Sequence, residues 1–188
     1  MCNIFDIANF FINVTISDKQ NNSFITNLKL NKLLYFVQGY SLVMTGKPLL
    51  NNRIEAWQDG PIIKDIYEKY KVYENKPITS VDKNYSESVF SSEELEVLLK
   101  VARKYGKLSA NCLTTIVCKK GTPWNKAYVE GDKKNISNDE ILNYFKNCED
   151  FSIRKMKYSL DDCIGYHNKE GYLVLPKDDD EDDWNEYN

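Results

Sequence analysis

The sequence contains a single histidine, His167, among its 188 residues. A Ser-His-Asp or Cys-His mechanism would therefore have only one base, and that base falls in a segment expected to form a β-hairpin. A zinc site needs several ligands at suitable spacing, and no such cluster appears. No G-x-x-x-x-G-K-[ST] loop and no G-x-G-x-x-G turn is present, which argues against a nucleotide-phosphate site. These absences predict a protein that is not an enzyme and has no metal or cofactor.

The five cysteines include no pair at C-x-x-C spacing. Their odd number and low density indicate free thiols in a reducing compartment. No apolar run is long enough for a transmembrane helix. The first residues lack a basic region and a small-residue cleavage site, so we expect no signal peptide. The expected location is the cytoplasm, or the host cytoplasm if the chain is viral.

Acidic residues are concentrated at the end of the chain. Residues 178–188 contain seven of the 28 acidic residues and no basic one, which leaves 21 against 25 Lys and Arg elsewhere. We expect a disordered acidic tail at 178–188, which either only solvates the chain, or mimics nucleic acid, or covers a basic patch until a partner displaces it. Alternating apolar residues predict a β-hairpin appendage at 151–177. Residues 1–150 then form the main domain.

Apolar residues at three- and four-residue steps predict a mainly α fold for this domain. The clearest helix follows Thr26 or Asn27 and ends at Gly46, with Pro48 as a stop. Other helices are expected over 4–14 and 61–71, after the capping boxes Ser91/Glu94 and Ser137/Glu140, after Ser109, and at Pro123. Residues 48–57 are expected to form a short β-hairpin around Asn51-Asn52.

The segment from Glu55 to Pro61 offers alternative interpretations. Glu55 and Asp59 could do acid–base work near the turn, or Asp59 could accept hydrogen bonds from the first turn of the 61–71 helix. Trp57 is expected to be largely buried, and Gly60 to adopt a conformation that a Cβ would strain. Nucleic-acid binding is disfavoured because the basic residues form only short pairs and no binding motif is present.

Two blocks of sequence resemble the SocA-like, or Panacea, antitoxin domain, which also occurs in phage-associated GepA-like proteins. The residues Leu30-Asn31-Lys32-Leu33-Leu34-Tyr35, followed by Gln38-Gly39, match its L-x-K-L-L-Y-x-x-Q-G helix. The residues Glu55-Ala56-Trp57 and Gly60-Pro61 match its E-A-W-x-x-G-P block. Pro123-Trp124 belongs to a third block, in which relatives carry a Thr-His pair that is replaced here around Cys118. The resemblance extends over roughly residues 4–147.

The resemblance implies a helical antitoxin that neutralises a cognate protein toxin by direct contact. In one relative the antitoxin delivers its toxin to the ClpXP protease, which adds a protease of that type as an expected partner. An alternative is a viral or mobile-element protein that binds a host factor and has no toxin partner. The expected partner-binding or motif residues are Lys32, Tyr35, Gln38, Glu55, Trp57, Asp59, Gly60, Pro61, Tyr67 and Trp124.

Overall fold

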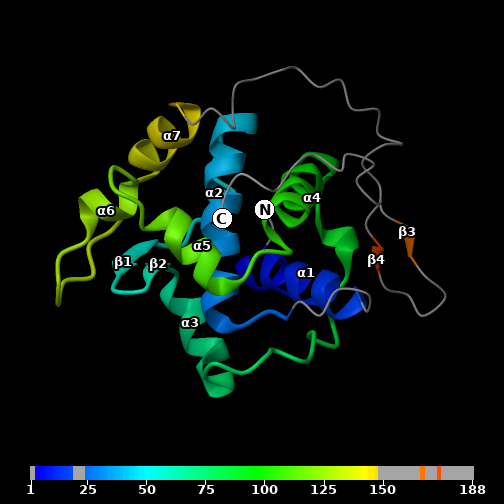
Figure 1. Ribbon diagram of the computed structural model, residues 1–188. Helices are drawn as coiled ribbons and strands as arrows, with labels where there is room; N and C mark the ends of the chain where they lie inside the picture. Colours follow the sequence, from blue (N-terminus) through cyan, green and yellow to red (C-terminus); the bar gives the residue numbers. More distant parts are fainter. Residues whose placement is uncertain (1–2, 19–23, 148–165, 168–172, 175–188) are drawn as a thin grey trace, which may run out of the picture.

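A computed structural model describes residues 3–18, 24–147, 166–167 and 173–174, and within these ranges the fold is mainly α-helical. Helix α2 (Asn27–Thr45) runs through the middle of the molecule, and α1 (Ile4–Ser17), α4 (Ser92–Tyr105), α5 (Ala110–Val117) and α7 (Asn138–Asn147) lie around it (Figure 1). Fifteen of the nineteen residues of α2 are buried. The core is therefore built around this one helix.

Both ends of α2 are where the sequence predicts them. The Thr26 hydroxyl accepts a hydrogen bond from the Lys29 amide at 3.3 Å. At the other end Gly46 adopts a left-handed conformation with φ of 73°, which a residue with a Cβ rarely adopts. The predicted capping boxes at Ser91 and Ser137 also form, and α4 and α7 follow them.

Aromatic rings fill the contact between α2, α4 and α7. The rings of Phe36 and Tyr105 stack with centroids 3.9 Å apart, and Phe145 packs edge-on against Phe36. Gly39 makes this approach possible, because a Cβ there would lie 2.5 Å from the Phe145 ring. The family-like Gln38-Gly39 pair thus includes a glycine that this close packing requires.

The prediction for residues 48–71 is wrong in its boundaries. The hairpin consists of β1 (Glu55–Trp57) and β2 (Gly60–Ile62), with Trp57 opposite Gly60 and a turn at Gln58-Asp59. Helix α3 begins at Lys64 and ends at Tyr70, so Pro61 lies in a strand rather than in the first turn of a helix. The predicted strands around Asn51-Asn52 do not form.

Two features explain the difference. Gly60 has a φ of 105°, so the chain reverses at the turn instead of entering a helix. Next, the Ile63 amide donates to the Asn31 side chain on α2 at 2.8 Å, and Ile63 stays extended. This contact joins residues 32 positions apart. Local sequence signals therefore could not reveal it.

Residues 134–136 pair with the outer edge of β1. The Ala56 amide donates to the carbonyl of Lys134, and the Ile136 amide donates to the carbonyl of Ile54, both at 2.8 Å. The short helix α6 (Pro123–Ala127) precedes this segment. The hairpin is thus held on one side by α2 and on the other by residues 134–136.

Two further strands, β3 (Tyr166–His167) and β4 (Leu173–Val174), pair antiparallel where a C-terminal hairpin is predicted. The acidic tail at 178–188 and most of the predicted appendage at 151–177 lie outside the described residues. The proposed domain boundaries therefore stay predictions. In the part of the chain that the structure describes, no helix combines the length and apolarity needed to cross a bilayer.

Candidate functional site

The inner side of the β1–β2 hairpin rests on a buried lysine. Lys32 is fully buried in α2, and its Nζ donates to the carbonyl oxygen of Pro61 at 3.2 Å. Burial lowers the pKa of Lys32 from its ordinary value of 10.5 to about 8, although Cys118 and Asp59 nearby oppose the shift. A Cβ on Gly60 would lie 2.7 Å from Lys32 Cε. The turn therefore needs a glycine above this lysine.

A neighbouring asparagine fixes the end of the hairpin. The Asn31 side chain is fully buried, and its oxygen accepts from Ile63 while its nitrogen donates to the Asn27 carbonyl at 2.9 Å. The Asn27 side chain in turn donates to the carbonyl of Tyr67 in α3 at 2.9 Å. These polar residues on α2 hold both β2 and α3 in place.

Gln38 holds the connection that precedes the hairpin. Its nitrogen donates to the Leu50 carbonyl at 3.1 Å, and its oxygen accepts from the Leu50 amide at 2.8 Å. The same nitrogen donates to Asn138 Oδ1 at 2.8 Å, at the start of α7. Gln38 is 1 % exposed, so a partner protein cannot reach it in this conformation.

The outer side of the hairpin carries an aromatic cluster. Trp57 is half-buried rather than largely buried as predicted, and its ring lies 4.9 Å from that of Tyr67. Its indole nitrogen donates to Glu55 Oε2 at 2.8 Å, and Lys133 Nζ lies 3.9 Å from its ring centroid. Such a position for a lysine over a tryptophan face is an attractive cation–π arrangement.

The turn itself projects from this cluster. Gln58 and Asp59 are both exposed. The interpretation of Asp59 as an acceptor for the first turn of a 61–71 helix is wrong, because α3 begins at Lys64 and Ile63 precedes it. We call Glu55, Trp57, Gln58, Asp59, Tyr67 and Lys133 together the hairpin surface.

Trp124 supports the hairpin surface from α6. It is 9 % exposed, and its indole nitrogen donates to the Trp57 carbonyl at 2.7 Å. The Trp124 ring stacks on Tyr128 with centroids 4.7 Å apart. The Pro123-Trp124 block of the sequence therefore fixes the backbone of Trp57, although the two tryptophans are far apart along the chain.

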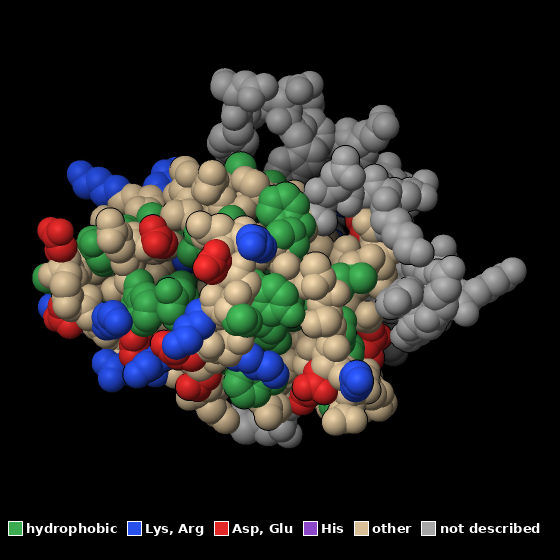
Figure 2. Space-filling view, turned by 90° about the horizontal axis from the view of Figure 1, so that it is seen from below, with side chains coloured by type: hydrophobic (Ala, Val, Ile, Leu, Met, Phe, Trp, Pro, Cys, Tyr) green, Lys and Arg blue, Asp and Glu red, His purple; other side chains and the backbone are tan. Residues whose placement is uncertain are grey.

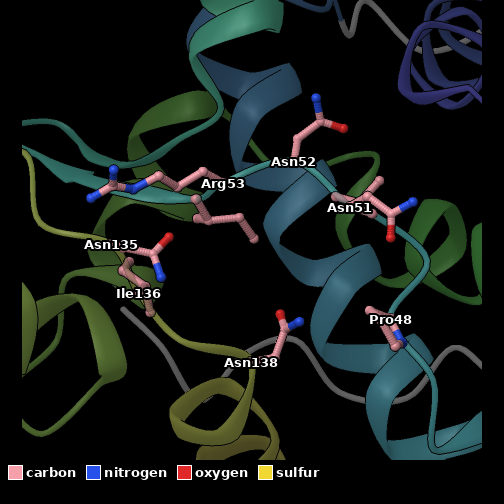
Figure 3. Close-up of a pocket in the computed structure, with 9 residues that line it drawn as sticks. Pro48, Asn51, Asn52, Arg53, Asn135, Ile136 and Asn138 are labelled. Atoms are coloured by element: carbon pink, nitrogen blue, oxygen red, sulfur yellow. The ribbon is translucent and has the colours of Figure 1, made fainter.

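A polar pocket of about 470 Å³ lies beside the hairpin, between residues 48–54 and 135–138 (Figure 3). In Figure 3, Arg53 and Asn135 lie on one side of the opening, and Asn138 points toward it from the start of α7. Arg53 and Ile54 directly precede β1, so the pocket is continuous with the edge of the hairpin. The sequence interpretation did not identify this pocket.

The structure brings together most of the predicted site residues but gives them different roles. Lys32 and Trp124 support the hairpin, and Gly60 and Pro61 are its buried residues above Lys32. Glu55, Trp57, Asp59 and Tyr67 lie on its outer side. Tyr35 lies in the core, where its ring packs against Phe145. The remaining predicted residue, Gln38, holds Leu50.

Sequence reasoning missed Asn31, Lys133 and Asn138. Asn31 had a detectable signal, because it is a polar residue four positions after Asn27 in a helix that is otherwise apolar on most sides. Lys133 and Asn138 had none, since each contacts residues more than seventy positions earlier in the chain.

Figure 2 shows the face of the molecule on which α3 lies, with small apolar groups among basic and acidic side chains. The two signs of charge are interspersed there, so this face lacks the continuous basic surface typical of a nucleic-acid footprint. Within the described ranges, no three His, Cys, Asp or Glu side chains are placed to hold a metal ion together.

These features define a small, mainly α domain in which one central helix supports an aromatic hairpin at the surface. Residues 30–125, just over half of the chain, match the family described as "Antitoxin SocA-like, Panacea domain". The chain belongs to this family. The matched range contains most of α2, the hairpin and Trp124, and it is narrower than the resemblance over 4–147.

A search of curated proteins finds similarity to a protein named "Antitoxin SocA" from Caulobacter vibrioides (strain NA1000 / CB15N). The two are 30 % identical over 112 residues, which cover 54 % of this chain and 58 % of the relative. The chain therefore spans little more than half the length of that protein. No solved structure matches the chain significantly.

Proposed function

We propose that the protein is an antitoxin that neutralises a partner toxin by direct contact through the hairpin surface. Membership of the SocA-like family supports the general role. The observation that carries the site is the position of the half-buried Trp57 and Tyr67 rings, beside the exposed Asp59 and Lys133, on the outer side of a hairpin whose inner side is fixed to α2. Tryptophan, tyrosine and adjacent charges are the groups that dominate the energetics of protein interfaces.

The support under the hairpin favours a binding role because it preorganises the surface. Lys32, Asn31 and Trp124 each bind a backbone group of the segment from Trp57 to Ile63. A surface held in its bound geometry loses less conformational entropy when a partner docks. The hairpin thus resembles a rigid contact patch rather than an adaptable loop.

The chemistry of the patch suits a partner with both apolar and charged groups. The Trp57 and Tyr67 rings provide apolar area, while Asp59 and Lys133 provide one charge of each sign. The polar pocket beside β1 adds a recess that a protruding side chain or a short extended segment of the toxin could enter. We infer that the toxin covers the hairpin surface and the rim of this pocket together.

In the simpler mechanism the antitoxin neutralises the toxin by occupying its surface. In the alternative mechanism it delivers the toxin to a ClpXP-type protease. The two differ in the fate of the toxin. Occupancy leaves the toxin level unchanged and requires stoichiometric antitoxin, whereas delivery lowers the toxin level and requires the protease. Protection that survives in a host strain without ClpXP therefore supports occupancy.

The first test is a growth assay with the reading frames adjacent to the gene for this chain. Each frame is expressed alone and with this chain, and complex formation is measured by co-purification. We expect one frame to be toxic alone, to be tolerated with the chain, and to co-purify with it. If no neighbouring product is toxic or bound, a role in binding a host factor replaces the antitoxin proposal.

The second test locates the interface. Trp57→Ala is expected to abolish protection, whereas Val89→Ala, which alters an exposed apolar side chain on the segment before α4, is expected to keep it. Full protection by the Trp57 variant would exclude the hairpin surface even if the toxin is found.

A further inference from the structure

A second pocket, of about 520 Å³, lies where the first turns of α2 and α5 meet. Lys29 of α2 and Asn111 of α5 line it, together with the N-cap residues of these helices, Thr26 and Ser109. Lys107 adds a second ammonium group. None of the described residues that line this pocket is acidic, and the charged groups that they contribute are both positive.

Burial of Lys29 in the wall of this pocket partly desolvates its ammonium group. Lys29 is 2 % exposed, and its Nζ has no hydrogen-bond or ion-pair partner among the described residues. Burial lowers the pKa of Lys29 below its ordinary value of 10.5. It also lies in the first turn of α2, where the helix dipole repels a cation, and that turn contains no acidic residue.

The two helix ends add further positive potential. Thr26 and Ser109 cap one amide each, those of Lys29 and Cys112. The other amides of each first turn have no partner within the helix and point out of its end. The first turn of α5 also lacks an acidic residue. Two such helix ends beside two lysines form a site suited to an oxyanion.

We propose that this pocket binds the phosphate group of a small phosphomonoester, with its organic part against the ring of Phe24. Phe24 lines the same pocket and is 57 % exposed, which leaves a ring face available. The pocket volume exceeds what phosphate alone requires and falls in the usual range for small-molecule sites of about 300–1,000 Å³. This site is independent of the proposed toxin contact.

No sequence motif marks this site, because residues 24–29, Asn75 and residues 107–111 line it from segments that are remote in sequence. The amide groups come from the starts of α2 and α5, and the ring comes from Phe24, three positions before α2 begins. A phosphate-binding loop motif instead places its glycines and lysine in one contiguous stretch. The absence of such a motif therefore does not exclude a phosphate site.

The test is calorimetric titration of the full chain in Tris chloride at constant ionic strength. The probes are inorganic phosphate, adenosine 5′-monophosphate, adenosine and acetate. We expect the monophosphate to bind more tightly than phosphate, and adenosine and acetate to give no measurable binding. Equal binding of phosphate and the monophosphate would keep the anion site and overturn the role of Phe24. Acetate binding as tightly as phosphate would overturn the preference for phosphate.

Three variants test whether phosphate binds in this pocket. Lys29→Met is expected to weaken phosphate binding by about tenfold or more, because it removes a charge-assisted contact. It should also raise the melting temperature in phosphate-free buffer, since it removes a partly desolvated charge. Lys107→Ala should weaken binding with an unchanged melt, and Lys120→Ala, beyond the other end of α5, should have no effect. Unchanged phosphate binding in both Lys29→Met and Lys107→Ala, or no phosphate binding by the parent, overturns the proposal.

Discussion

The inner and outer sides of the β1–β2 hairpin differ in how their polar groups are used. On the inner side, Lys32 and Asn31 are fully buried, and each pairs with a backbone group of the hairpin or its end. On the outer side, Trp57 is half-buried, and Asp59 and Lys133 are exposed. A single sequence block therefore contains residues that fix the fold and residues that are available to a partner.

This difference distinguishes residues that stabilise the fold from residues that can contact a partner, which the sequence alone does not do. Gln38 and Asp59 look equally suitable as partner contacts in the sequence, because both are polar and lie two positions from an aromatic residue. In the structure Gln38 pairs with both backbone groups of Leu50, whereas Asp59 projects from the turn. Substitution of a buried residue such as Gln38 is therefore expected to lower stability more than binding. Substitution of an exposed residue such as Asp59 is expected to lower binding more than stability.

The largest effect on stability is expected for Gln38→Ala. This change leaves the buried amide and carbonyl groups of Leu50 without partners, which should cost about 2–4 kcal/mol. Chemical denaturation measures the loss. The matched control is Gln58→Ala, an exposed glutamine in the hairpin turn, which should change the unfolding free energy by less than about 0.5 kcal/mol. Equal effects of the two variants would contradict a difference between the two sides.

Gly60→Ala is expected to cost about 1–3 kcal/mol from its positive φ, with an added cost from the clash with Lys32. Gly131→Ala separates the two contributions, because Gly131 also has a positive φ of 76° but has nothing within 4 Å of an added Cβ. Thermal melting of both variants measures the difference. A Gly60 variant no less stable than the Gly131 variant would show that the lysine does not support the turn.

Lys32 should make stability depend on pH. Its pKa is about 8 in the folded protein and about 10.5 when unfolded, so the unfolded chain binds more protons between these values. The penalty for burying the charge is fully present below pH 8 and is relieved as the pH rises. From pH 8 to 9 the parent should gain about 1 kcal/mol relative to Lys32→Met.

The comparison with Lys32→Met is needed because another group acts in the opposite direction. Burial raises the pKa of the Cys118 thiol to about 11, which lowers stability as the pH rises past the value of an ordinary thiol. That contribution is present in both proteins and largely cancels in the difference. Parallel stability curves for parent and variant between pH 8 and 9 would mean that Lys32 is not desolvated.

The smallest effect on stability is expected for Asp59→Ala. The side chain is exposed in the turn, so its removal should alter the unfolding free energy by less than about 0.5 kcal/mol. If Asp59 contacts the toxin, the same variant should dissociate faster from it in surface plasmon resonance. A clear drop in melting temperature would instead assign Asp59 to the support of the hairpin.

Local signals predicted much of the fold. Thr26, Gly46 and the two capping boxes act on residues within a few positions, and the helices that they delimit are confirmed. The hairpin was misplaced because its boundary depends on the contact between Asn31 and Ile63, which is remote in sequence. Composition and periodicity cannot report such a contact.

The sequence predicted many of the residues that belong to the candidate site, but not how they are arranged in it. The family-like blocks contain Lys32, Trp57 and Trp124, which the structure places around one hairpin. Which of them is buried depends on contacts between blocks, such as that of Trp124 with the Trp57 carbonyl. Exposure is a property of the assembled surface, so the residue types alone did not distinguish a support from a contact.

The most direct test of the central claim measures toxin affinity and melting temperature for Trp57→Ala together with Asp59→Ala in one variant. If the outer side of the hairpin is a contact surface, the double variant should lose affinity by roughly 30-fold or more, as expected for hot-spot residues. Its melting temperature should be closer to that of the parent than the melting temperature of Gln38→Ala is. Parent-like affinity in a folded variant would contradict the claim that the outer side of the hairpin binds the toxin.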